Sequence, residues 1–100
     1  MQAVLEAIRS QRRRDILRLV WDEERSAGDI ASRFDVTWSA ISQNLKVLRS
    51  AGLVVERREG TKRFYRADPA ALGSLERAIR EMWEHDLDAV ADAMEREHYG

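Results

Sequence analysis

The sequence predicts a mainly α-helical domain that contains one small β-hairpin. Two observations carry this prediction. Apolar spacing and capping residues indicate four helices before position 52 and a long fifth helix from Pro69. Between them, residues 53–67 are rich in β-branched, aromatic and basic side chains around a Glu-Gly turn, as expected of a hairpin. We expect the 100 residues to form a single domain, residues 1–100.

The first two helices are predicted within residues 1–25. Val4, Leu5 and Ile8 follow helical spacing near the N-terminus. Ser10 is a suitable cap for the second helix, because its hydroxyl can accept a hydrogen bond from an amide of the first turn. The charged run that starts at Asp22 is expected to end this helix. Its apolar residues are Ile16, Leu17, Leu19, Val20 and Trp21.

A helix-turn-helix is predicted over residues 26–51. Ser26 and Asp29 have the form of a capping box, so a third helix is expected from there to about Phe34. Asp35 and Val36 then form the turn.

The fourth helix is expected to follow Thr37, whose hydroxyl is a natural cap. Ile41, Leu45 and Leu48 recur at spacings of four and three and therefore share one face. Gly52 stands where a left-handed residue commonly ends a helix. Two strands should follow, joined through Glu59-Gly60 in a hairpin, or wing, over residues 53–67; they are Leu53 to Arg58 and Thr61 to Ala67.

The last helix is predicted over residues 69–97. Asp68 is a capping acid, Pro69 is favoured at the first helical position, and Gly73 can kink the first turns. An apolar stripe of this length exceeds what a small domain can cover alone, so we assign it to a partner helix, with an intramolecular core as the alternative. The stripe consists of Leu72, Leu75, Ile79, Met82, Trp83, Leu87, Val90 and Met94.

The charges divide the chain into two parts. Residues 1–66 hold 14 Lys and Arg against 9 Asp and Glu, a net charge of +5. Residues 67–100 hold 3 and 9, a net charge of −6. The basic part suits a polyanion, whereas the acidic part would repel one and is better placed away from it.

The order helix, turn, helix and basic hairpin is typical of proteins that read double-stranded DNA. The polar face of the fourth helix carries hydroxyls, amides and a lysine, which pair with base edges, and the hairpin adds cations for phosphates. Trp38 either contacts DNA or packs on the third helix. A merely solvated face is the alternative. The predicted DNA-contacting residues are Thr37, Trp38, Ser39, Ser42, Gln43, Asn44, Lys46, Arg57, Arg58, Lys62 and Arg63.

A second basic cluster lies at the start of the second helix. Arg12, Arg13 and Arg14 oppose the dipole of that helix, which costs a few tenths of a kcal/mol. They either contact phosphate or pair inside the fold. We favour the structural role for Arg13 and Arg14.

Three segments, taken together, resemble one family. They are Arg13 to Leu17 (RRDIL), Ile41 to Val54 (ISQNLKVLRSAGLV), and the wing's Arg58-Glu59-Gly60 with Tyr65. The chain resembles ArsR-type winged helix-turn-helix transcriptional repressors over essentially its whole length. Asn44 stands where that family usually has His, and Asp35 where its turn often has Gly.

The resemblance implies a homodimer that binds an imperfect palindrome in a promoter and excludes polymerase. It also implies that the first and last helices join the two subunits. The interface residues expected on this basis are Val4, Leu5, Ile8, Leu75, Ile79, Met82, Trp83, Leu87, Val90 and Met94. Residues 36–48 (VTWSAISQNLKVL) and the tryptophan of the last helix look most like the branch of the family without metal sites. The resemblance implies that members of this branch often repress their own operon.

Metal sensing is not expected. The resemblance implies a cysteine site in the third helix, and this chain has no cysteine. The family's last-helix zinc site needs two inner histidines eleven residues apart, whereas His85 and His98 are thirteen apart and lie on different sides of a helix. Asp86 and Glu97 do share a face, but two carboxylates without a nitrogen ligand make a poor transition-metal site. We therefore expect no metal and no cofactor.

Other functional classes are less well supported. No nucleophile, base and orienting acid converge, so an enzyme is disfavoured. One rival is a winged-helix module that binds protein, although such a module usually loses its basic wing. Another is a small-molecule sensor with a pocket at the dimer interface lined by Trp21, Met82 and Trp83. With no apolar run long enough for a membrane and no signal-peptide pattern, we expect a cytoplasmic protein without a membrane partner.

Overall fold

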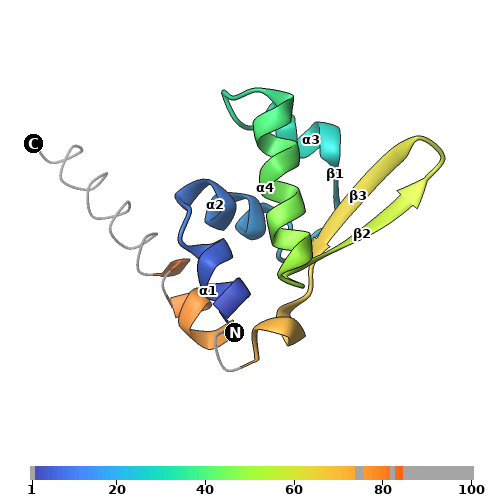
Figure 1. Ribbon diagram of the computed structural model, residues 1–100. Helices are drawn as coiled ribbons and strands as arrows, with labels where there is room; N and C mark the ends of the chain where they lie inside the picture. The colour runs from blue at the N-terminus through green and yellow to red at the C-terminus, as the bar shows by residue number, and fades with distance from the viewer. Residues whose placement is uncertain (1, 74–75, 82, 85–100) are drawn as a thin grey trace, which may run out of the picture.

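The computed structural model describes residues 2–73, 76–81 and 83–84. Helices α1 (Gln2–Ile8) and α2 (Gln11–Leu19) lead to strand β1 (Arg25–Ser26), helix α3 (Ala27–Ser32) and helix α4 (Trp38–Ser50). Strands β2 (Val54–Glu59) and β3 (Lys62–Ala67) and the 3₁₀ helix η1 (Pro69–Leu72) follow, and residues 76–81 and 83–84 are helical. This is the predicted fold class, a winged helix-turn-helix (Figure 1).

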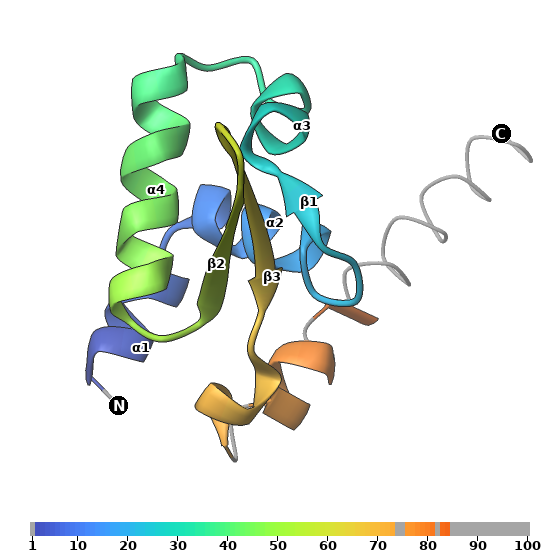
Figure 2. The ribbon, with the colours of Figure 1, turned by 90° about the vertical axis from the view of Figure 1, so that its right-hand side faces the viewer.

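The sheet has three strands instead of the predicted two. The short β1 pairs with β3, which makes the strand order β1-β3-β2, all antiparallel (Figure 2). Two residues without a hydrophobic pattern give no strand signal, so β1 could not be predicted. The hairpin turn is also one residue later than predicted, because Glu59 pairs with Lys62 and Gly60 takes a positive φ of 62°. A glycine with positive φ at the first of two turn residues is typical of a hairpin.

The predicted capping residues begin α2, α3 and α4, and Gly52 ends α4. Ser10, Ser26 and Thr37 each accept a hydrogen bond from an amide three residues later. Gly52, with φ 79°, ends α4: its amide donates to the carbonyl of Arg49, and the Leu53 amide donates to that of Leu48. These two bonds form a Schellman motif, which satisfies carbonyls at the helix end.

Two arginines join α1 to α2. Arg13 donates through Nε to the carbonyl of Ala7 (2.6 Å) and through Nη2 to that of Glu6 (3.0 Å). Arg14 Nη1 donates to the carbonyl of Ile8 (2.6 Å). These carbonyls belong to the C-terminal end of α1, where a cation is favourable. The predicted structural role of both arginines is confirmed.

The core lies between α2, α4 and the inner face of the sheet. It includes residues from every described helix and from β2 and β3, and its fully buried members come mainly from α2, α3 and α4. The largest are Ile16, Leu17, Ile30, Ile41, Leu45, Leu48, Leu53 and Leu72.

The segment after the wing differs from the single helix predicted from residue 69. Asp68 makes no side-chain capping bond, and Gly73, with φ 55°, ends η1 as a separate turn. Ile79 and Trp83, expected at a partner helix, are 5% and 9% exposed within this chain's own core. Assigning these two residues to a partner therefore needs correction. Of the other predicted interface residues, Leu75, Met82, Leu87, Val90 and Met94 lie outside the described residues.

None of the described helices is both long and apolar enough to cross a membrane.

Candidate nucleic-acid interface

The outer face of α4 presents polar side chains to solvent. Because Ile41, Leu45 and Leu48 are buried, the opposite side of the helix is exposed and carries Ser39, Ser42, Gln43 and Lys46. The Thr37 hydroxyl accepts from the Ala40 amide at 3.1 Å, so this side chain caps the helix. The hydroxyl, amide and ammonium groups of this face are of the kinds that pair with base edges in a major groove.

Asn44 differs from these residues because its side chain is engaged within the fold. Its Nδ2 donates to the Ala40 carbonyl at 2.9 Å, and its Oδ1 accepts from Arg13 Nη1 at 3.5 Å. Asn44 therefore links α4 to the arginine that holds α1. Asn44 thus has a structural role, and its contact with DNA stays a prediction.

Trp38, in the first turn of α4, is 53% exposed. It lines a hollow of about 600 Å³ together with residues of the β1–α3 junction and of the wing. The wing side of the hollow is formed by Thr61, Lys62, Arg63 and Phe64. The ring is thus presented between α4 and the wing, with about half of its surface available to a partner.

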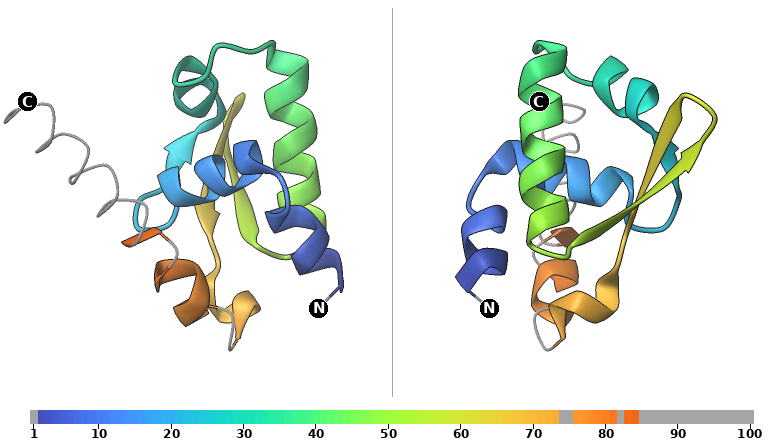
Figure 3. Two further views of the ribbon diagram at one scale, coloured as in Figure 1. Left: turned by 90° about the vertical axis from the view of Figure 1, so that its left-hand side faces the viewer. Right: turned by 45° about the vertical axis from the view of Figure 1, so that its right-hand side comes forward.

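The wing diverges from α4 after leaving its C-terminal end (Figure 1, and Figure 3, right). Side chains alternate between the two faces of a strand, so the register divides the wing cations into two sets. Arg58 and Arg63 are cross-strand partners on the face that also holds the buried Tyr65. Arg57 is paired with Phe64 on the opposite face.

The set that faces α4 is organised by Glu56, whose side chain is only 7% exposed. Arg58 Nε donates to Glu56 Oε1 at 3.2 Å, Arg63 Nε lies 3.7 Å from the same oxygen, and Arg49 of α4 binds Oε2. Burial alone would raise the pKa of Glu56, but the hydrogen bonds from Arg58 and Arg49 more than offset it, so its pKa lies below the ordinary value. The carboxylate is therefore ionised among three cations.

The set on the opposite face consists of Arg57, Lys62 and Arg66, of which Arg57 is bonded within the fold. Its Nε and Nη2 donate to both oxygens of Glu24, at 3.1 and 2.7 Å, and its Nη1 donates to Glu59 at 2.9 Å. The guanidinium also lies over the Phe64 ring, 4.7 Å from its centre. These bonds raise the pKa of Arg57 above its ordinary value and lower that of Glu24. Arg57 thus ties the wing to the segment before β1, and its contact with DNA stays a prediction.

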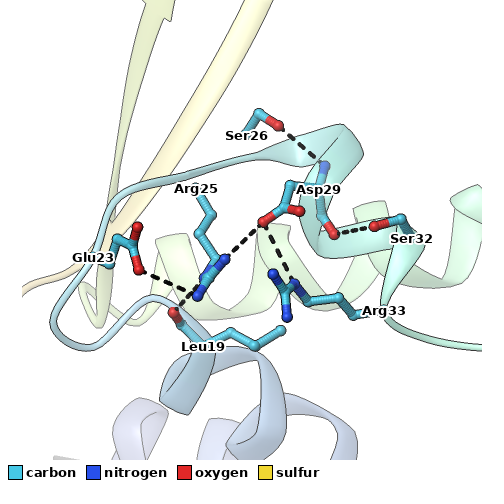
Figure 4. Close-up of polar contacts among 7 residues, drawn as sticks. All are labelled: Leu19, Glu23, Arg25, Ser26, Asp29, Ser32 and Arg33. Carbon is cyan, nitrogen blue, oxygen red and sulfur yellow. Dashed lines mark hydrogen bonds and ion pairs between the residues drawn. The ribbon is translucent and has the colours of Figure 1, made fainter.

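The start of α3, where the family's thiol site would lie, is occupied by an ion-pair network (Figure 4). Asp29 Oδ2 accepts from Arg25 Nη1 at 2.9 Å and lies 3.5 Å from Arg33 Nε, while Arg25 Nη2 lies 3.3 Å from Glu23. The hydrogen bond from Arg25, with the charge of Arg33, holds the pKa of Asp29 below its ordinary value. Within the described residues, no three His, Asp or Glu side chains are placed to hold a metal ion, and His85 and His98 lie outside them.

The aromatic residues of the proposed small-molecule pocket pack against each other. Trp21 and Trp83 meet edge to face, with ring centres 4.9 Å apart and planes at 87°, and both are buried. Met82 lies outside the described residues. The two rings pack in the core, and they also line a hollow of about 270 Å³ with Arg18, Asp22, Arg80 and Glu84.

Comparison with known proteins agrees with this geometry. Residues 10–55 match the family described as bacterial regulatory protein, arsR family. The HTH-type transcriptional regulator Rv2034 of Mycobacterium tuberculosis is 33% identical over 92 residues, which is 92% of this chain and 86% of that protein. The transcriptional activator HlyU of Vibrio cholerae is 42% identical over 62 residues, covering 62% of this chain and 57% of HlyU.

A solved structure shows the same fold. It is the homodimeric winged helix-turn-helix DNA-binding domain, a fragment of residues 1–100, of Mb0332 from Mycobacterium bovis, a possible ArsR-family regulator. The two chains are 32% identical, with a TM-score of 0.72, over 83% of this chain and 77% of that one. The exposed polar helix, the cationic wing beside it and these relatives agree: the chain belongs to the ArsR family of transcriptional regulators, which bind DNA through a winged helix-turn-helix.

Proposed function

We propose that this protein binds a two-fold symmetric operator in double-stranded DNA as a homodimer and represses the promoter that contains it. One observation carries the proposal. The exposed polar face of α4 and the wing residues Lys62 and Arg63 border the same hollow, with Trp38 and Ser42 on its helix side. A single duplex could therefore engage both elements at once.

The two elements have different tasks in this proposal. Ser39, Ser42 and Gln43 contact base edges in the major groove, where a bidentate Gln–adenine pair discriminates by roughly 1–3 kcal/mol. Lys46 and Lys62, which are exposed, contact phosphates. Trp38 contacts the sugar-phosphate edge or a thymine methyl.

Dimerisation is proposed through α1 and the last helix. Leu5 of α1 is 47% exposed, which leaves an apolar side chain available to a second subunit. The Mb0332 domain, similar in sequence and fold, is described as homodimeric. Two copies of α4 related by a dyad would read two half-sites about one helical turn, roughly 34–36 Å, apart.

Repression is proposed because a dimer seated across a promoter blocks polymerase by occupying the same DNA. The similar HlyU is named an activator, so the effect on transcription depends on where the operator lies. We further propose that the protein is not an enzyme, needs no cofactor and works in the cytoplasm, because the relatives Rv2034 and HlyU are named as regulators of transcription.

The test is a titration of duplex DNA at several salt concentrations. Fragments selected from the source genome should bind more tightly than a mixed-sequence duplex. The affinity should fall steeply between about 50 and 200 mM salt, with a log–log slope of about −0.9 for each phosphate neutralised. Equal affinity for both duplexes, unchanged by salt, would contradict the proposal. Transcription in vitro from a promoter that contains the selected site should then fall as protein is added.

A further inference from the structure

Three arginines around Glu56 suggest a more specific role for this part of the interface. We call Arg49, Glu56, Arg58 and Arg63 the Glu56 cluster. Its cations come from α4, β2 and β3, and all three contact the one carboxylate. The cluster thus connects the helix proposed to read bases with both strands of the wing.

A small hollow of about 150 Å³ opens beside this cluster. It is lined by Ser42, Lys46 and Arg49 of α4 and by Arg63 and Tyr65 of β3, with Leu45 at its base. Glu56 contacts Arg49 and Arg63 but is not among the residues that line the hollow. The lining therefore contains three cationic side chains and the hydroxyl-bearing Ser42 and Tyr65, without a carboxylate.

We propose that this hollow seats one phosphate of the DNA backbone, and that Glu56 is a positioning residue that orients Arg49 and Arg63 toward it. This inference rests on the proposed function and identifies a single contact within it. A guanidinium has five N–H donors in a fixed fork, so a bond to Glu56 leaves others for a phosphate oxygen. Prior ordering of both side chains lowers the entropy lost on binding.

Charge and orientation predict opposite effects for removing this acid. Glu56→Gln keeps the shape of the side chain but removes one negative charge from an interface with a polyanion. If Glu56 merely reduced the positive potential, the variant would bind DNA more tightly. If Glu56 positions the arginines, the variant binds more weakly despite its extra positive charge.

The experiment compares wild-type protein and Glu56→Gln on the selected operator and on a mixed-sequence duplex by fluorescence anisotropy. We expect the affinity of the variant for both duplexes to fall at least about threefold, because interaction energies between contacting groups are commonly of that size. Tighter or unchanged binding would overturn the inference. Glu81→Gln, which also removes one negative charge, at a side chain that is 64% exposed and pairs with Arg77, is the matched control and should bind as wild type does.

Two further variants keep the test valid if Glu56→Gln does not fold. Arg49→Lys and Arg63→Lys preserve charge but lose the fork, so each should weaken binding. If both variants bound DNA as tightly as wild type, the proposal that oriented arginines bind a phosphate in this hollow would be contradicted.

The seated phosphate can also be located directly. Single phosphates of the operator are replaced with neutral methylphosphonates, and the affinities of wild-type protein and Lys46→Ala are compared on each duplex. At one position in each half-site, Lys46→Ala should cause no further loss of affinity, because the contact has already been removed. Additive losses at every position would refute the seat. Salt-independent binding by wild-type protein would instead refute the proposed function itself, so the two failures can be distinguished.

Discussion

Arg13 makes more hydrogen bonds within the fold than an exposed arginine usually does. It binds two carbonyls at the end of α1 and the side chain of Asn44 on α4. Arg13→Lys keeps the charge, but a single ammonium group cannot bond all three acceptors as the guanidinium does. We therefore expect the variant to lower the free energy of unfolding by about 1–3 kcal/mol. Urea unfolding measures this loss. Arg9→Lys, at a site whose side chain is 77% exposed, should change it by no more than about 0.5 kcal/mol.

Asp29 is expected to make stability depend on acid pH. Its pKa in the folded protein lies below the unfolded value, chiefly because Arg25 donates a hydrogen bond to the carboxylate. A lowered folded pKa gives stability that is present above the unfolded pKa and lost as pH falls through the folded one. Asp29→Asn should therefore have a lower Tm than wild type at neutral pH, and the difference should shrink below about pH 4. A difference that stays constant down to strongly acidic pH would refute this assignment.

The residues that could be predicted are those whose signals are local. Ser26 and Thr37 bond amides three residues away, so the sequence around them contains the whole motif. Arg57 and Asn44 could not be assigned in this way. Their partners Glu24 and Arg13 are 33 and 31 residues distant in sequence, and only the folded chain brings them together.

At the scale of elements, Gly52 determines how α4 turns into the wing. Its φ of 79° is unfavourable for residues with a Cβ, but a Cβ built there would meet no atom within 4 Å. The cost of Gly52→Ala is therefore one of backbone conformation, about 1–2 kcal/mol. Thermal unfolding should show this loss. Gly28→Ala, in α3 and equally unobstructed, should be neutral or slightly stabilising, and equal losses at both sites would contradict the explanation.

The division of tasks between α4 and the wing predicts two kinds of variant. Gln43→Ala should change which operator sequences bind best, because it removes a contact to bases. Lys62→Ala should weaken all duplexes alike and reduce the salt slope by about 1 for each subunit, because it removes a contact to phosphate. Binding selections with randomised half-sites measure both effects. The reverse pattern would show that the two elements have been assigned to the wrong tasks.

The wing itself was predictable from sequence, but the use of its cations was not. Strand alternation places Arg57 on the face opposite Arg58 and Arg63 for either turn. The register instead determines which residue lies across from Arg63: Glu56 for a turn at Glu59-Gly60, and Arg58 for the observed turn at Gly60-Thr61. The short β1 also adds Arg25 and Ser26 to the sheet, which no hydrophobic pattern indicated.

In the molecule as a whole, the two parts of the chain differ in net charge and in the proposed use of their apolar side chains. The basic residues 1–66 include the whole candidate DNA interface, and the acidic residues 67–100 follow it. Part of the apolar stripe predicted for a partner helix is used inside the monomer, by Leu72, Ile79 and Trp83. The central proposal is a two-fold dimer that presents one α4 helix from each subunit to the DNA. The symmetry of this dimer determines the symmetry of the DNA sites.

Selection of genomic fragments bound by the purified protein tests that proposal most directly. We expect a consensus with two inverted half-sites whose centres are about 10 base pairs, or a multiple of one helical turn, apart. Enrichment of a single unrepeated site, or of no sequence at all, would contradict it.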